Sequence, residues 1–170
     1  MVITIFELTL SIVIGILSLY VMHYVILKIY KRKTNDEDPY QNVSFLIFLS
    51  GILFSVGYLL SGIMTPLSST LDMLNNGQNS SFEILFSFTK YIGIFTFLGL
   101  VLGCIINYLT YLIFSSLTTK LDELEEIKNG NVGIAILVSV IAITMAVFCK
   151  EPFLLVLEYF IPYPEIPTIL

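Results

Sequence analysis

The densest group of chemically active side chains in this sequence is a run of carboxylates. Asp122, Glu123, Glu125 and Glu126 lie within five residues of one another. Clustered carboxylates bind basic side chains through charge-assisted hydrogen bonds, whereas anionic lipid repels them. We interpret the run as a candidate docking surface for a basic patch on a cytoplasmic partner protein. The simpler interpretation is a solvated connector between two helices.

An apolar stripe at helical spacing accompanies these carboxylates and consists of Leu117, Leu121, Leu124 and Ile127. Thr119 and Asp122 are placed as a capping box, and Gly130 is suited to ending a helix. The pattern predicts a short amphipathic helix over residues 119–129 that carries the acids on its polar face.

His23 and Asn107 are the other polar side chains with a candidate role inside apolar stretches. Histidine can relay protons near neutral pH, and an asparagine amide can join helices in lipid by hydrogen bonding. The functional interpretation places both side chains along a central pore or relay. The simpler interpretation makes His23 an interfacial group and Asn107 a link between helices.

The common catalytic arrangements are absent from the sequence. A single histidine excludes the His-x-x-x-His metalloprotease pair, and there is neither a Gly-x-Ser-x-Gly elbow nor a Walker-type loop. The four aspartates, Asp36, Asp38, Asp72 and Asp122, all lie outside the apolar stretches, which argues against an intramembrane aspartyl protease. We expect a protein that is not an enzyme and that uses no metal or cofactor.

Four apolar stretches carry these side chains, and each is long enough to cross a bilayer. They run from Thr4 to Leu27, Val43 to Met64, Tyr91 to Phe114 and Val132 to Cys149, and contain 24, 22, 24 and 18 residues, where about 20 are needed. Only 12 % of the chain is charged, compared with about 25 % in soluble domains. We expect an all-α polytopic membrane protein in which residues 1–170 form a single transmembrane domain. Residues 65–90 are then the longest segment outside the spans, and Pro152 ends the fourth span.

Basic residues indicate the orientation. Six of the eight flank the two loops that follow the first and third stretches: Lys28, Lys31, Arg32, Lys33, Lys120 and Lys128. By the positive-inside rule both loops are cytoplasmic and both termini are outside. The outer side then carries six carboxylates against two lysines, which offers nucleic acid no surface to bind.

The second and fourth stretches resemble each other. Residues 42–52 align with residues 131–141 without a gap, and five of the eleven positions are identical. Asn42 and Asn131 occupy the same place before each helix, where an asparagine side chain can accept hydrogen bonds from unpaired amides of the first turn. The alignment predicts a tandem parallel repeat of helical hairpins, with one repeat over residues 3–66 and the other over residues 84–160.

A resemblance to a known family is found in the segment Leu121-Asp-Glu-Leu-Glu-Glu-Ile-Lys-Asn-Gly-Asn-Val-Gly-Ile-Ala-Ile136. It resembles the family of small bacterial inner-membrane proteins typified by YjfL. The repeat unit that this resemblance implies has three parts in order: a span, an acidic loop ending in Glu-Ile-x-x-Gly-Asn, and a second span rich in Ala, Gly and Ile. The first half departs from the pattern because Gln41 stands where the second half has Gly130. The resemblance implies a multi-pass protein of the bacterial inner membrane. The function of that family is largely unknown, and some of its members are similar to neighbours of envelope-stress proteins.

Small residues spaced for close helix contact occur in every span. In lipid, small residues let helix backbones approach one another. The candidate packing residues are Ser11, Gly15, Gly51, Ser55, Gly57, Ser61, Gly99, Gly103, Ala135 and Ser139. They predict contacts between the four helices and, through the same faces, a homo-oligomer in the lipid bilayer.

Two functions are compatible with these features. The first is a non-enzymatic integral membrane subunit that anchors or signals to a cytoplasmic partner through the acidic segment, in an envelope-stress or defence response. The second is an oligomeric ion channel or small transporter that uses His23 and Asn107.

Overall fold

The computed structural model describes residues 2–76, 81–117 and 122–161, and the regular elements in these ranges are all helical. They are α1 (Val2–Thr34), η1 (Pro39–Gln41), α2 (Val43–Leu60), η2 (Ser61–Ile63), α3 (Met64–Asn76), α4 (Ser81–Leu117), α5 (Glu123–Lys128) and α6 (Val132–Glu158). Four helical segments are long and apolar enough to cross a membrane, the second being the continuous run of α2, η2 and α3. The fold is therefore all-α, with four candidate membrane spans.

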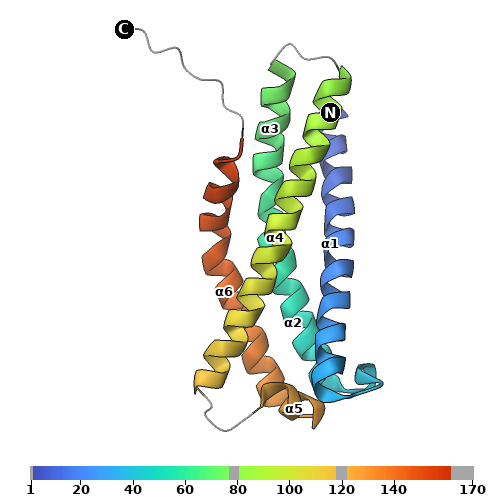
Figure 1. Cartoon of the computed structure of the whole chain (residues 1–170), viewed down its shortest axis with the longest axis vertical. Coiled ribbons are helices and arrows are strands. Elements are labelled where there is room, and N and C mark those ends of the chain that lie inside the picture. Colours follow the sequence, from blue (N-terminus) through green and yellow to red (C-terminus); the bar gives the residue numbers. More distant parts are fainter. Residues whose placement is uncertain (1, 77–80, 118–121, 162–170) are drawn as a thin grey trace.

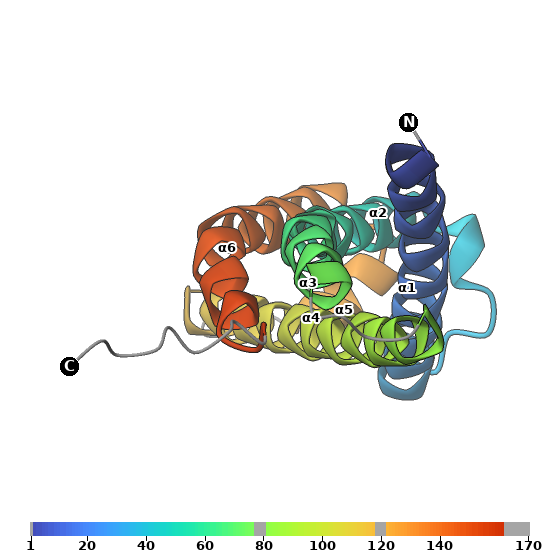
Figure 2. The ribbon, with the colours of Figure 1, turned by 90° about the horizontal axis from the view of Figure 1, so that it is seen from above.

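The four spans stand side by side (Figure 1). The loop after α1 and the short helix α5 lie at one end, which we call the α5 end. The start of α1 and the end of α6 lie toward the other. Seen along the bundle, α2 and α6 are neighbours on one side and α4 crosses the other (Figure 2).

The second span is the centre of the packing. Of its most apolar part, 56 % is buried, compared with 22 % for the first and third spans and 28 % for the fourth. Its most extensive contact is between α2 and α6. There the Ser139 hydroxyl donates to the carbonyls of Ala135 and Ile47, 2.8 and 3.2 Å away. A Cβ on Gly51 would collide with Ser139, whose Cα lies 2.9 Å from that position.

Other small residues also allow close contact with α2. A Cβ on Gly99 would collide with Leu60, and one on Gly103 would lie 3.1 Å from Val56. Gly57 meets only ordinary contact with α1, where Leu19 is 3.6 Å away. Ser55 and Ala135 are both buried. Gly99 and Gly103 therefore let α4 approach α2 closely.

Three of the candidate packing residues do not lie at a tight helix contact. A Cβ on Gly15 would meet nothing within 4 Å among the described residues. The prediction that Gly15 packs against another helix is therefore wrong within one copy of the chain. Ser11 donates to Leu8 of its own helix. Ser61 is exposed and accepts a hydrogen bond from Lys150, which also lies over the ring of Tyr58.

The helices extend beyond the predicted stretches. Most of residues 65–90 is helical, because α3 continues to Asn76 and α4 begins at Ser81. Leu67, Thr70 and Phe88 are buried where these two helices pack, which stabilises them outside the apolar stretches. Pro66 lies in the first turn of α3, immediately after the 3₁₀ segment η2, and the helical run continues through it.

The prediction that Pro152 ends the fourth span is wrong. Helix α6 continues through it to Glu158. An interior proline removes one backbone hydrogen bond and costs about 3 kcal/mol. Phe153 and Leu157 beyond it are buried in the core of the bundle, and their van der Waals contacts there favour the continued helix. Packing therefore offsets the local cost.

Replacing Gly51 by alanine tests the α2–α6 contact. The new methyl group collides with Ser139, so we expect Gly51→Ala to lower the free energy of unfolding by about 1–3 kcal/mol, measured by denaturation in detergent micelles. Gly93→Ala, at an exposed glycine of α4, is the matched control and should be neutral or slightly stabilising, because its methyl group enters open space and alanine favours helix. Equal effects of the two substitutions would contradict the contact.

Candidate functional site

Helix α5 is a short, well-capped element at the α5 end. Asp122 is its N-cap and accepts a hydrogen bond from the Leu124 amide at 3.2 Å. Gly130 ends it with a φ of 85°, and the amides of Gly130 and Asn131 donate to the Ile127 and Glu126 carbonyls. This is the Schellman arrangement that glycine favours. The helix is shorter than the predicted 119–129, and the proposed capping residue Thr119 lies outside the described residues.

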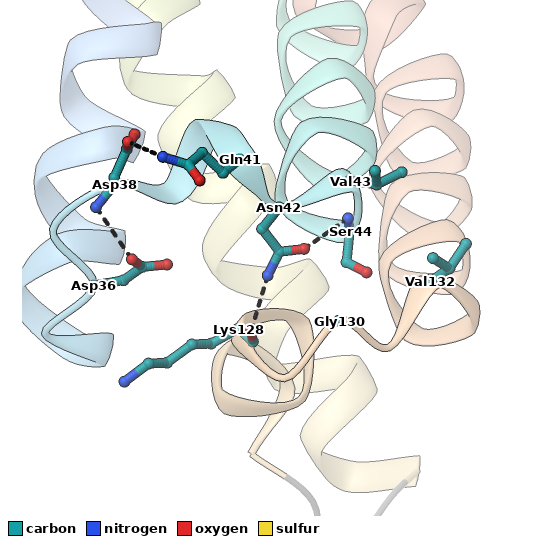
Figure 3. A pocket seen from close by; sticks show the side chains of 9 residues that line it. All are labelled: Asp36, Asp38, Gln41, Asn42, Val43, Ser44, Lys128, Gly130 and Val132. Carbon is teal, nitrogen blue, oxygen red and sulfur yellow. Dashed lines mark hydrogen bonds between the residues drawn. The ribbon is translucent and has the colours of Figure 1, made fainter.

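Asn42 joins α5 to the start of α2 (Figure 3). Its side-chain oxygen accepts hydrogen bonds from the Ser44 and Phe45 amides at 2.9 and 3.4 Å, which caps α2. Its side-chain nitrogen donates to the carbonyls of Ile127 and Lys128 at 2.9 and 2.8 Å. One amide thus satisfies unpaired groups at the start of one helix and the end of another.

Asn131 acts more locally. Its oxygen caps α6 by accepting from the Ile134 amide at 3.3 Å, and its nitrogen donates to the Glu126 carboxylate at 2.9 Å.

Two lysines fasten α5 to the end of α1. Lys33 forms an ion pair with Asp122 at 3.0 Å and donates to the Tyr111 hydroxyl at 3.1 Å. Lys128 donates to the Thr34 carbonyl at 2.7 Å. Since Leu124 and Ile127 are buried beneath them, α5 is packed against the bundle rather than suspended between two spans.

Glu123 does not belong to the exposed acidic face. Its side chain is 2 % exposed, and neither carboxylate oxygen accepts a hydrogen bond from another described residue. The prediction that it contributes to a docking surface is therefore wrong. Residues four apart share a helix face, and Glu123 lies four residues before Ile127 of the apolar stripe. This spacing was the sequence signal that Glu123 would be buried. Asp122 is exposed but paired, Glu126 is half-buried, and Glu125 is exposed.

Burial is the main influence on the Glu123 carboxyl and raises its pKa, because the charged form loses its hydration. The neighbouring charge of Asp122 raises this pKa as well, whereas the backbone amide of Glu123 and the charge of Lys33 oppose the shift. A carboxyl with a raised pKa retains its proton at a higher pH than an ordinary glutamic acid.

An apolar cavity of about 410 Å³ lies beside Glu123. Its walls come from α1, α2, α4, α5 and α6 and include Ile26, Ile52 and Val138. Asn107 also lines it. The Asn107 nitrogen donates to the Gly103 carbonyl at 2.8 Å, while its oxygen is buried and has no hydrogen-bond partner among the described residues. Sequence reasoning identified Asn107 but missed the cavity, which depends on five separate helices.

His23 lies apart from this cavity. Its ring nitrogen is 2.9 Å from the Tyr40 hydroxyl and its ring stacks on that of Tyr40, in the loop before α2. The structure therefore does not bring His23 and Asn107 to a common lining.

A second, open recess of about 480 Å³ lies between the loop before α2 and the turn from α5 to α6 (Figure 3). Asp36, Asp38 and Lys128 line it. Gln41 donates to Asp38 at 2.7 Å, and the Asp38 amide donates to Asp36 at 3.2 Å. Within the described ranges, no three His, Cys, Asp or Glu side chains are grouped as metal ligands would be.

Four apolar spans closed at one end by a short packed helix define a multi-pass membrane protein. Residues 1–151 match the family model described as "Domain of Unknown Function (DUF350)", so the chain belongs to this family. Comparisons with curated proteins and with solved structures gave no match.

The raised pKa of Glu123 predicts a pH dependence of stability. The folded state holds the proton more tightly than the unfolded state, so stability should fall as pH rises from the ordinary value of 4.5 through the raised pKa. Glu123→Gln should remove this dependence and stabilise the protein near neutral pH, measured by thermal unfolding in detergent between about pH 4 and pH 8. Glu125→Gln, at an exposed position, should leave the profile unchanged; a profile unaffected by Glu123→Gln would contradict the assignment.

Proposed function

We propose that this protein is a non-enzymatic membrane subunit that binds a cytoplasmic partner protein at its α5 end. The observation that carries the proposal is the fastening of α5 by Asn42, Lys33 and Lys128 to two different spans. A docking surface requires side chains held in a fixed relation, and a free connector would not need these bonds. The positive-inside rule supports a cytoplasmic α5 end and outer termini.

The proposed docking surface consists of Glu125 and Glu126 on α5 together with Asp36 and Asp38 of the adjoining recess. Glu123 is excluded by its burial, and Asp122 is engaged with Lys33. Acidic groups around an open recess suit a partner that presents lysine or arginine side chains. Such a pairing supplies specificity and a fast association rate more than affinity.

The wider setting that we propose is an envelope-stress or defence response in a bacterial inner membrane. The outer ends of the spans would sense the perturbation and the α5 end would report it. A homo-oligomer belongs to the same proposal: the half-buried Ser11 and Gly15 leave an edge of α1 open, where a second copy could approach closely.

Charge reversal tests the docking surface. Glu125→Lys combined with Glu126→Lys should reduce the amount of partner recovered in affinity purification from native membranes by about tenfold, because two attractive contacts become repulsive. Glu151→Lys, an exposed residue at the opposite end of α6, is the control for a change of net charge. Unchanged recovery of the co-purifying proteins, with the variant inserted normally, would contradict docking at α5.

An oligomeric channel or small transporter is the second candidate function. The observation in its favour is the cavity among the spans, in which the Asn107 oxygen has no hydrogen-bond partner within the described part of the chain. Polar groups of this kind inside a membrane mark the paths of ions and solutes.

Flux through liposomes distinguishes this candidate. Reconstituted protein should release potassium or protons faster than empty liposomes do, and Asn107→Leu should reduce that release severalfold by removing the polar group. Asn75→Leu, the same change at an exposed position of α3, should have no effect. Leakage equal to that of empty liposomes would exclude conduction of these ions.

A further inference from the structure

The cavity beside α5 has the composition of a small-molecule site. Its volume of about 410 Å³ falls in the range of about 300–1,000 Å³ that is typical of ligand pockets. Apolar side chains form most of its lining, with Met22, Ile26 and Ile52 among them. Tyr108 and Tyr111 add aromatic rings on the α4 side. Such a lining favours a ligand with an apolar body.

Within the described ranges, three of the unpartnered polar atoms in the cavity lining are hydrogen-bond acceptors, and a fourth, the Tyr30 hydroxyl, can both donate and accept. Both carboxylate oxygens of Glu123 and the side-chain oxygen of Asn107 are buried without a partner among the described residues. A buried acceptor without a donor costs about 1–3 kcal/mol. A ligand that brings several N–H donors would satisfy these oxygens.

The net charge of the groups at the cavity also favours a ligand with N–H donors, in cationic form. Lys33 also lines the cavity, but its ammonium group is committed to Asp122 at 3.0 Å and to the Tyr111 hydroxyl at 3.1 Å. With Glu123 ionised, these two acids and one lysine carry a net charge of −1. One monovalent cation bound in the cavity would balance that charge.

We infer that this cavity binds a small amphipathic amine in its protonated form. The ammonium group pairs with the Glu123 carboxylate and donates to the Asn107 oxygen, and the apolar body packs against Met22, Ile26 and Ile52. This site is separate from the proposed docking surface, and binding does not require transport.

Amine binding should be coupled to the release of a proton. The titratable groups that line the cavity around Glu123 are Lys33 and Tyr30 on α1 and Cys104, Tyr108 and Tyr111 on α4, while Asp122 adjoins it on α5. The parts of α2 and α6 that line the cavity contribute only Phe48, Ile52 and Val138. Glu123 is the acid in this group whose proton must leave before an ion pair can form, so affinity should increase with pH.

The test is isothermal titration of the full-length protein in maltoside detergent with hexylammonium, octylammonium and phenethylammonium, and with the corresponding neutral alcohols. We expect at least one amine to bind with about tenfold higher affinity than its alcohol, and Glu123→Gln to remove that preference. Glu125→Gln, which exchanges an exposed carboxylate, is the matched control and should retain it.

A second measurement on the unaltered protein covers the case in which Glu123→Gln does not fold. Amine affinity should rise with pH, and titration in buffers of different ionisation enthalpy should detect proton release on binding. Equal affinities for amine and alcohol, an affinity independent of pH, or no binding by any of the three amines would each overturn the inference. These outcomes would not contradict the docking proposal, because that proposal depends on Glu125 and Glu126 and is tested by the amount of partner protein recovered.

Discussion

The α5 end of the bundle depends on the side-chain amide of Asn42. Its oxygen caps α2 and its nitrogen donates to the last two carbonyls of α5, which lie 85 and 86 residues further along the chain. Leaving such groups unsatisfied when they are buried costs about 1–3 kcal/mol each. The ion pair of Lys33 with Asp122 at the start of α5 and the hydrogen bond of Lys128, at its end, to the Thr34 carbonyl of α1 add to this fastening. With α5 held there, Leu124 and Ile127 become part of the core.

The burial of Glu123 follows from that constraint. Three residues of α5 face the bundle, and two of them are apolar; the third carries a carboxylate into the same apolar surroundings. A buried carboxyl without a hydrogen-bonding neighbour is costly, and such groups concentrate at functional sites. Its coincidence with a cavity and with the unpartnered Asn107 oxygen distinguishes it from an ordinary surface acid of a connecting loop.

Much of the fold could be predicted because membrane spans depend on length and hydropathy. The four spans, the caps at Asn42 and Asn131 and the termination at Gly130 all follow from local composition and local backbone geometry. The extensions through residues 65–90 and past Pro152 could not be predicted in this way. They are stabilised by contacts of Leu67, Phe88, Phe153 and Leu157 with other helices.

The sequence by itself determined that the chain enters a membrane with four helices, and which residues begin and end several of them, because these properties depend on neighbouring residues. Only the tertiary structure decided which polar groups are accessible. Glu123 and Glu125 are two residues apart in one acidic run, yet the first is buried and the second is exposed. Likewise, Gly51 meets another helix and Gly15 meets open space. Burial depends on which other parts of the chain pack against a residue, and the local composition around that residue does not determine this.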